Sequence, residues 1–119
     1  MYKIGEFSKI TNLSIRTLRY YDEVNVLKPG FVDKFSGYRY YTDENLNDVE
    51  IINFMKYVGF SLEEIVMYKD SLTNEVLENK KTELFGIQEE LVDKINKINE
   101  LQKAIKSEKF VKVLKNDAA

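Results

Sequence analysis

One uninterrupted helical pattern, over residues 74–109, constrains the fold of this chain more than any other feature. The segment contains no proline, and its single glycine, Gly86, costs about 1 kcal/mol relative to alanine, which so long a helix tolerates. The pattern therefore predicts one continuous helix, on the order of 50 Å long at ~1.5 Å per residue. Such a helix reaches far beyond a small N-terminal domain, so most of its surface needs another partner.

Apolar residues recur at intervals of seven along this predicted helix and define a candidate coiled-coil seam. The seam consists of Leu77, Leu84, Leu91, Ile98 and Ile105, with Ile87, Ile95 and Leu101 filling in nearly the same stripe. Lys94 occupies a position where the repeat would place an aliphatic residue, so the seam is imperfect. Because the chain has no second long helix to cover the stripe, we expect it to join two copies of the chain, in parallel or antiparallel orientation.

A helix-turn-helix pattern occupies the N-terminal region. A first helix is predicted over residues 4–10, the Thr11-Asn12 link follows, and Ser14 is a favoured N-cap for a second helix. Two helices joined by so short a link are typical of helix-turn-helix proteins, in which the second helix enters the major groove of DNA.

The second helix has an apolar side and a basic side. Ile15, Leu18 and Tyr21 share the side that is expected to pack, where the phenol of Tyr21 needs a polar partner. The residues on the other side that we expect to contact DNA are Arg16, Arg19 and Tyr20. Thr17 beside them serves either phosphate or base, or is a plain helix-surface residue. Ser14 is expected both to cap the helix and to approach the DNA backbone, since a helix N-terminus suits phosphate.

The pattern changes from helical to extended after residue 28. Lys28-Pro29-Gly30 is a turn signal, Phe31 and Val32 begin a strand, residues 33–37 form a loop and residues 38–41 form an aromatic strand. This predicts a β-hairpin, or wing. A two-stranded hairpin is marginal alone, so the wing must lie against the helices.

Several wing residues are candidates for contact with DNA. Gly37 is a turn glycine, and Arg39 is expected to hold a phosphate. Lys34 at the wing loop reaches phosphate or is merely solvated. Alternation along the strand leaves open which of its tyrosines touches DNA.

Two more helices and a tail complete the predicted architecture, which is mainly α. Thr42 caps a helix that runs to about Tyr57 and ends at Gly59, and Ser61 with Glu64 forms a capping box that opens a short helix. We therefore predict a winged helix-turn-helix domain over 1–72, a coiled-coil dimerisation helix over 73–109 and a tail over 110–119.

Composition narrows the function. The chain contains neither cysteine nor histidine, which removes disulfides, the commonest zinc, copper and iron ligands and the commonest general base. We therefore expect no metal, no cofactor and no enzymatic activity. No run approaches the roughly 18 apolar residues of a membrane span, and the N-terminus lacks a signal-peptide pattern, so a cytoplasmic protein without membrane contact is predicted.

Charge is segregated along the chain. The net charge is −2 overall, but residues 1–41 contain seven Lys and Arg against four Asp and Glu, a net of +3. Phosphate contacts need local positive charge, which this first third supplies. The acidic remainder is interpreted as solvated helix faces.

The order of these motifs resembles the MerR family of bacterial transcription regulators. The motifs are a helix-turn-helix, the sequence Arg-Thr-Leu-Arg-Tyr-Tyr-Asp, a Gly-Tyr-Arg-Tyr-Tyr wing, a second helix pair and a long coiled-coil helix, and together they span about residues 2–109. The wing is most similar to that of the multidrug-responsive branch that includes BmrR and Mta.

The resemblance implies a homodimer whose two heads are held apart by an antiparallel coiled coil. Each head is then expected to read one half of a palindromic promoter site, and activation to work by distorting an overlong promoter spacer so that RNA polymerase engages both promoter elements. It also implies that Tyr38 contacts double-stranded DNA through its hydroxyl, and that Lys56 and Tyr57 belong to a second wing in which Lys56 contacts the DNA backbone.

The C-terminus departs from the family. Relatives that sense drugs continue into a large effector domain. A small-molecule effector is therefore expected only if such a domain is missing from this chain. The apolar run at 110–114 resembles the start of an unfinished strand or helix, which favours a truncated protein over a naturally sensor-free one. Two other functions stay open. One is a DNA-architectural protein similar to excisionases, and the other is a coiled-coil adaptor whose head binds protein.

Overall fold

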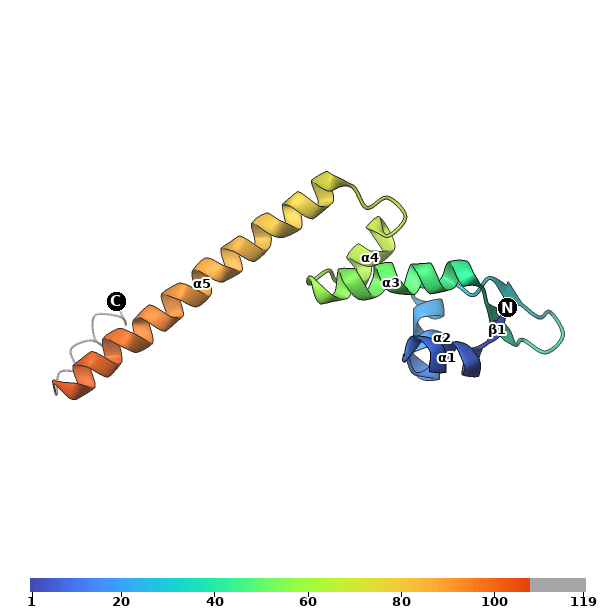
Figure 1. Ribbon diagram of the computed structural model, residues 1–119, viewed down its shortest axis with the longest axis horizontal. Coiled ribbons are helices and arrows are strands. Elements are labelled where there is room, and N and C mark those ends of the chain that lie inside the picture. The colour runs from blue at the N-terminus through green and yellow to red at the C-terminus, as the bar shows by residue number, and fades with distance from the viewer. Residues whose placement is uncertain (108–119) are drawn as a thin grey trace. The chain divides into compact units, whose positions relative to one another are not determined.

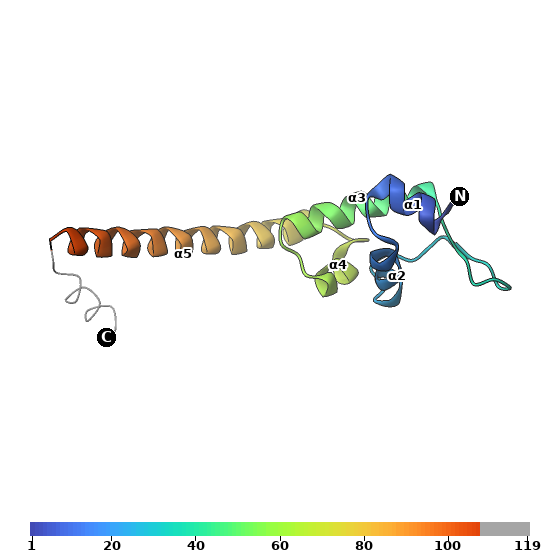
Figure 2. The ribbon, with the colours of Figure 1, turned by 90° about the horizontal axis from the view of Figure 1, so that it is seen from below.

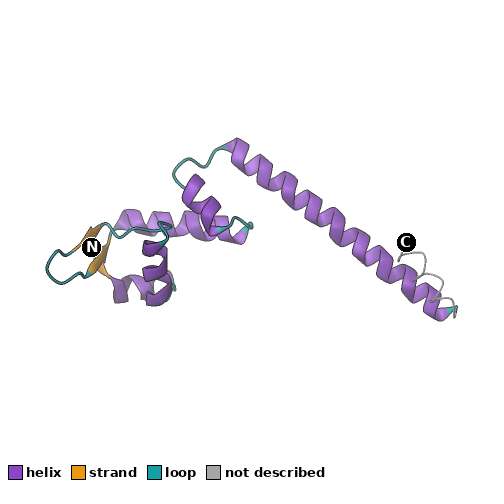
Figure 3. Ribbon diagram, turned by 180° about the vertical axis from the view of Figure 1, so that it is seen from behind, coloured by secondary structure: helices purple, strands orange, loops and turns teal. Residues whose placement is uncertain are grey.

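The computed structural model describes residues 1–107, and five helices and three short strands make up this part of the chain (Figures 1 and 3). In chain order they are β1 (Tyr2–Lys3), α1 (Ile4–Thr11), α2 (Ile15–Glu23), β2 (Phe31–Val32), β3 (Arg39–Tyr41), α3 (Asp43–Tyr57), α4 (Leu62–Tyr68) and α5 (Asn74–Lys106). The predicted fold class, a mainly helical winged helix-turn-helix with a long C-terminal helix, is confirmed. The chain separates into two compact units, the first being Met1–Leu77 and the second beginning at Glu78.

The wing belongs to a three-stranded antiparallel sheet in the order β1-β3-β2. Phe31 pairs with Tyr40 and Val32 with Arg39, so the predicted hairpin is present, and the ring of Phe31 lies 5.9 Å from that of Tyr40. Tyr38, which was predicted to begin the second strand, lies just before β3. The added strand is β1, in which Tyr2 pairs with Tyr41. The wing is therefore anchored through its central strand to the N-terminus of the chain.

Helices α1, α2, α3 and α4 share one apolar core. Its fully buried side chains are Phe7, Leu18, Val26, Leu27, Tyr41, Ile52, Met55 and Ile65. The ring of Phe7 stacks on that of Tyr41 with a centroid distance of 4.4 Å, which joins α1 to the sheet. The expectation that Ile15 packs with Leu18 and Tyr21 is wrong, because 39% of Ile15 remains exposed.

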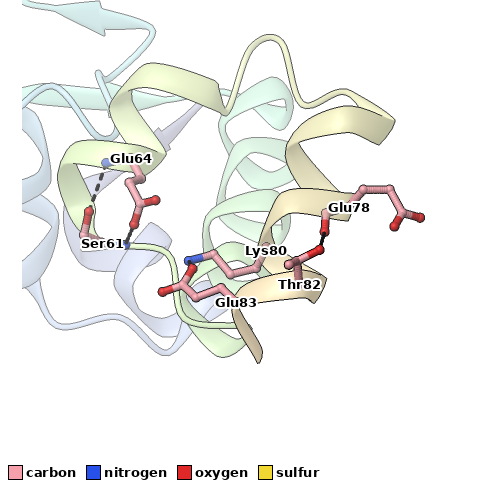
Figure 4. A network of polar contacts seen from close by, with 6 residues as sticks. All are labelled: Ser61, Glu64, Glu78, Lys80, Thr82 and Glu83. Carbon is pink, nitrogen blue, oxygen red and sulfur yellow. Dashed lines mark hydrogen bonds and ion pairs between the residues drawn. The ribbon is translucent and has the colours of Figure 1, made fainter. Parts of the chain in front are cut away.

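The predicted helix boundaries are confirmed by their caps. Ser14 accepts a hydrogen bond from the backbone of Thr17 at 3.0 Å, and Thr42 caps α3 in the same way. In the box that opens α4, Ser61 and Glu64 each accept a bond from the other's backbone N–H (Figure 4). Gly59 ends α3 with a φ of 101°, the left-handed conformation that glycine adopts most readily.

Helix α5 is continuous from Asn74 to Lys106 and is followed by a turn at Ser107, whereas residues 108 and 109 of its predicted extent and the tail lie outside the described residues. Two polar contacts on it link residues within one turn: Lys80 pairs with Glu83 at 2.7 Å, and Thr82 donates to the backbone of Glu78 at 3.1 Å (Figure 4). The predicted seam residues that are exposed are Leu84, Ile87, Leu91, Ile95, Ile98 and Ile105, whereas Leu77 and Leu101 are partly buried. No helix within residues 1–107 is both long and apolar enough to cross a membrane.

Candidate nucleic-acid interface

The turn between α1 and α2 determines where α2 begins. Asn12 adopts a left-handed φ of 60°, which reverses the chain after α1, and the Ser14 cap then starts α2. The Ser14 hydroxyl also donates to the hydroxyl of Thr17 at 2.9 Å, so both side chains are engaged at the first turn. This local geometry fixes where the basic side of α2 lies.

The basic side of α2 forms a shallow depression of about 420 Å³. It is lined by Arg16, Arg19, Tyr20 and Glu23, and all four residues are exposed. Arg16, Arg19 and Tyr20, three of the residues predicted to contact DNA from this helix, are therefore neighbours on one surface. Glu23 at its edge was not predicted, and its carboxylate limits the positive potential there.

One aspartate, Asp33, fixes the conformation of the wing loop through hydrogen bonds to its backbone. Oδ1 of Asp33 accepts hydrogen bonds from the backbone N–H groups of Phe35 and Ser36, at 2.8 and 3.1 Å. These two bonds hold the pKa of the Asp33 carboxyl below its ordinary value. Gly37 closes the loop with a φ of 75° and donates from its N–H to the carbonyl of Asp33. The loop projects away from α1, α2 and α3 (Figures 1 and 2) with Lys34 exposed on it.

Asp22 at the end of α2 links that helix to the wing. Oδ2 accepts a hydrogen bond from Nε of Arg39 on β3, and Oδ1 pairs with Nζ of Lys28, both at 2.8 Å. Only 15% of the Asp22 side chain is exposed. Partial burial acts to raise the pKa of Asp22, but the bonds from Lys28 and Arg39 outweigh it and hold that pKa below its ordinary value.

This contact changes the role expected of Arg39. A guanidinium has five N–H donors, and the bond to Asp22 uses the one on Nε, so the bond sets the direction of the group while the Lys28–Asp22–Arg39 trio stays net positive. Asp22 is the last residue of the Arg-Thr-Leu-Arg-Tyr-Tyr-Asp motif, but the sequence alone indicated no role for it. The partners are 17 residues apart along the chain, and no local pattern links them.

Lys56 and Tyr57, at the end of α3, differ in their surroundings. Nζ of Lys56 donates to the hydroxyl of Tyr21 at 2.8 Å and lies 5.5 Å from the centre of that ring. The hydroxyl of buried Tyr21 thus has the polar partner that its burial requires. Tyr57 is exposed.

Asn45 on α3 holds the segment that leads into the wing. Its Oδ1 accepts from the N–H of Gly30 at 3.1 Å and its Nδ2 donates to the carbonyl of Lys28 at 3.0 Å. A side chain at Gly30 would place Cβ 2.5 Å from Cγ2 of Thr42, so any larger residue there requires Thr42 to shift. Sequence reasoning found the Thr42 cap but missed Asn45, whose position three residues after the cap was its one available signal.

Residues 2–72 match the model of the MerR helix-turn-helix family of regulatory proteins. The chain belongs to the MerR family. Over 69 residues, which are 58% of this chain and 25% of the relative, it is 48% identical to the multidrug-efflux transporter 1 regulator of Bacillus subtilis (strain 168). The chain thus spans about a quarter of the length of that MerR-family relative.

Two solved structures share the fold. One is the N-terminal part of Mta, the Bacillus subtilis multidrug transporter activator, with a TM-score of 0.76 and 30% identity over 84% of this chain and 96% of that one. The other is the EcmrR–DNA complex in EcmrR-RPo, with a TM-score of 0.76 and 32% identity over 87% of this chain and 40% of that one. The winged head and the long helix are therefore common MerR-family architecture. Within residues 1–107, no group of three or more acidic side chains is gathered to hold a metal ion.

Proposed function

We propose that this chain is a sequence-specific DNA-binding regulator of transcription that acts on promoter DNA as a homodimer. The observation that carries the proposal is that two hollows on the head share Arg19 and are lined by arginines of both α2 and the wing. Arg16 and Arg19 line the depression on α2, and Arg19 also lines an open cavity that Arg39 and Tyr38 of the wing border. Helix and wing thus present one surface to one ligand, as a protein that reads a groove and grips its backbone requires.

The residues divide into two groups under this proposal. Arg16, Arg19 and Tyr20 read base edges in the major groove, and Ser14 and Thr17 lie at the helix N-terminus near the backbone. The residues assigned to the sugar-phosphate backbone are Lys34, Gly37, Tyr38, Arg39, Lys56 and Tyr57. Arg39 and Lys56 have a double task, because each also makes a hydrogen bond to α2 that orients its element.

Dimerisation is assigned to α5, with the DNA-binding head over 1–72 and the dimerisation helix from 73. The exposed row of Leu84, Leu91, Ile98 and Ile105 repeats every seven residues, which is the spacing of a coiled-coil seam. Lys94 and Lys80 both stand at positions of the repeat that favour aliphatic residues, so the seam is weakest at those two levels. An antiparallel pairing separates the two heads, as binding to two halves of a palindromic site requires.

The mode of action proposed is distortion of the promoter spacer, with RNA polymerase as the partner at the promoter. The likeness to EcmrR, solved with DNA in EcmrR-RPo, supports this mode. The exposed apolar row on α5 favours a dimeric regulator over an excisionase-like architectural protein, which needs little more than the head.

A binding isotherm tests the proposal. The DNA is the region immediately upstream of the chain's own coding sequence, and random DNA of equal length is the control. Saturation at two chains per duplex with a clear preference for the upstream DNA supports the proposal. Equal and strongly salt-dependent binding to both DNAs points to an architectural role, and no binding to either points to the adaptor.

The division of roles has its own test. Arg16→Ala should reduce the difference in binding free energy between cognate and random DNA by about 1–3 kcal/mol if Arg16 makes a bidentate base contact. Arg39→Ala should weaken both DNAs alike and make the salt dependence shallower by about one unit, as for a lost phosphate contact. Identical behaviour of the two variants would contradict the division.

A further inference from the structure

An open cavity on the head lies between α2 and the wing. Its volume is about 460 Å³, and it is open to solvent on one side. It is lined by Lys3, Ile4, Gly5, Glu6, Ile15, Arg19, Gly37, Tyr38 and Arg39. Three segments that are far apart in sequence therefore meet around it: the N-terminal strand with the start of α1, helix α2, and the wing.

The charges around this cavity favour an anion. Each of the three segments contributes one cation, namely Lys3, Arg19 and Arg39. One lining residue is acidic, Glu6, and its Oε1 accepts a hydrogen bond from the backbone N–H of Lys3 at 3.3 Å. Because Asp22 is shared between Arg39 and Lys28, it does not cancel the positive charge on the wing side. The balance of charge is positive.

The remaining lining is apolar, which a simple anion would not need. Ile4 and Ile15 line the cavity together with Tyr38. The helical pattern predicted Ile15 in the core, yet 39% of it is exposed, and Tyr38 is 65% exposed. Cations beside aliphatic and aromatic carbon match a group that carries negative charge and hydrocarbon side by side. A deoxyribose with its phosphate is such a group, since phosphate takes the cations and the sugar takes the apolar surface.

We propose that this cavity binds one deoxyribose-phosphate unit of the operator backbone, with Lys3 as a phosphate contact and Ile15 as a sugar contact. The inference rests on the proposed function and deepens it, because it adds the N-terminal strand to a surface so far assigned to α2 and the wing. β1 pairs with β3, so Lys3 and the wing move as one sheet. One nucleotide held there is gripped by helix and wing together.

The test compares two lysines on the same stretch of chain. Lys3 lines the cavity, whereas Lys9, also exposed, lies in the last turn of α1 and does not line it. Operator affinity is measured at a series of salt concentrations, on the order of 50 to 300 mM, for the wild type, Lys3→Gln and Lys9→Gln. The slope of log affinity against log salt concentration is then compared between the three proteins. Lys3→Gln should lower the slope by about one unit and the affinity roughly 5- to 10-fold at 0.1 M salt, for cognate and random DNA alike, and Lys9→Gln should change neither.

The apolar part is tested with Ile15→Ser. This variant should lose roughly 3- to 10-fold in affinity with an unchanged salt slope, because it removes apolar contact and no charge. Thermal unfolding of each variant checks that the head is intact. Ethylation interference on the operator adds a structural readout: Lys3→Gln should relieve interference at a single phosphate in each half-site, and Lys9→Gln at none.

The outcomes separate this inference from the proposed function. Equal slopes for the wild type and Lys3→Gln, or equal losses in Lys3→Gln and Lys9→Gln, would overturn the cavity as a backbone site while leaving operator binding in place. If inorganic phosphate at constant ionic strength removes the effect of Lys3→Gln, the cavity is a free-phosphate site and the proposal is wrong. Failure of the wild type to bind any operator would overturn the proposed function first.

Discussion

The head and the long helix differ in where their apolar side chains find partners. In the head, Phe7, Leu18 and Ile52 are fully buried within a single copy of the chain. Along α5, Leu91 and Ile98 are each more than half exposed, although they are as apolar as the core residues. The head thus buries its apolar residues within a single chain. The exposed apolar row of α5 would be buried only against a second surface.

Polar contacts repeat the contrast. Asp22 and Asn45 each join segments that are 15 to 17 residues apart, and both are largely buried. On α5 the ion pairs of Lys80 with Glu83 and of Lys81 with Glu78 each lie within one turn. Substitutions in the head should therefore lower the stability of the folded chain, and substitutions on the α5 seam should change assembly.

The largest effect is expected for Leu91→Asp on the α5 seam. A charge at this position opposes seam formation and should convert dimers to monomers, which removes the benefit of binding two half-sites at once, roughly 10²- to 10⁴-fold in operator affinity. Light scattering and a binding isotherm measure both effects. Asn96→Asp is the matched control, because at 100° per residue it adds the same charge on the opposite side of α5. A dimer that survives Leu91→Asp would reject this seam.

The next largest effect is expected in the head, for Asn45→Ala. The substitution leaves the N–H of Gly30 and the carbonyl of Lys28 without their partner, which should lower the free energy of unfolding by about 2–4 kcal/mol. Urea unfolding at a fixed protein concentration measures it. Asn47→Ala on the exposed side of α3 should stay within about 0.5 kcal/mol of the wild type. Equal stability of the two variants would show that the wing segment does not depend on this amide.

A smaller and pH-dependent effect is expected for Asp22→Asn. Loss of the shared carboxylate should lower the free energy of unfolding by about 1–3 kcal/mol near neutral pH. The pKa of Asp22 is depressed in the folded chain, so its contribution is present above the unfolded value of about 3.9 and is lost as pH falls through the folded pKa. The wild type and Asp22→Asn should therefore converge in acid. Glu23→Gln, which replaces the exposed acid next along α2, is the control. Its difference from the wild type in free energy of unfolding should not change with pH in this way.

The smallest effect, of opposite sign, is expected for Tyr41→Phe. The Tyr41 hydroxyl is buried and has no hydrogen-bond partner among the described residues, and its burial raises the pKa of the phenol. Removing it should leave stability unchanged or raise it by up to about 1 kcal/mol. Tyr21→Phe is the contrasting variant, since its hydroxyl accepts from Lys56, and it should destabilise by about 0.5–1.5 kcal/mol. A clear loss in Tyr41→Phe, seen in thermal unfolding, would mean that its hydroxyl has a partner after all.

Sequence reasoning succeeded where the physics is local. The caps at Ser14, Thr42 and Ser61 and the glycine end at Gly59 depend on residues within one turn, and each could be predicted from neighbours alone. The hairpin itself was predicted from its turn residues and strand pattern, but its register was not. The two-residue strand β1 was missed because it is too short to display alternation.

The parts that sequence reasoning missed depend on tertiary contact. Asp22 meets Arg39, and Asn45 meets Gly30, only after the head has folded. Ile15 was placed in the core because helical periodicity reports which side of a helix is apolar and says nothing of what covers it. The cavity beside Ile15 arises from three segments, so no single stretch of sequence contains its signal.

The double attachment of the wing has a kinetic consequence. Asn45 holds the backbone at Lys28 and Gly30 from one side, and Asp22 holds Lys28 and Arg39 from the other. Under the proposed function, the wing and α2 meet DNA as one preformed surface, so association requires no ordering of either element. Substitutions of uncharged contact residues should accordingly change the association rate little and shorten the residence time on the operator.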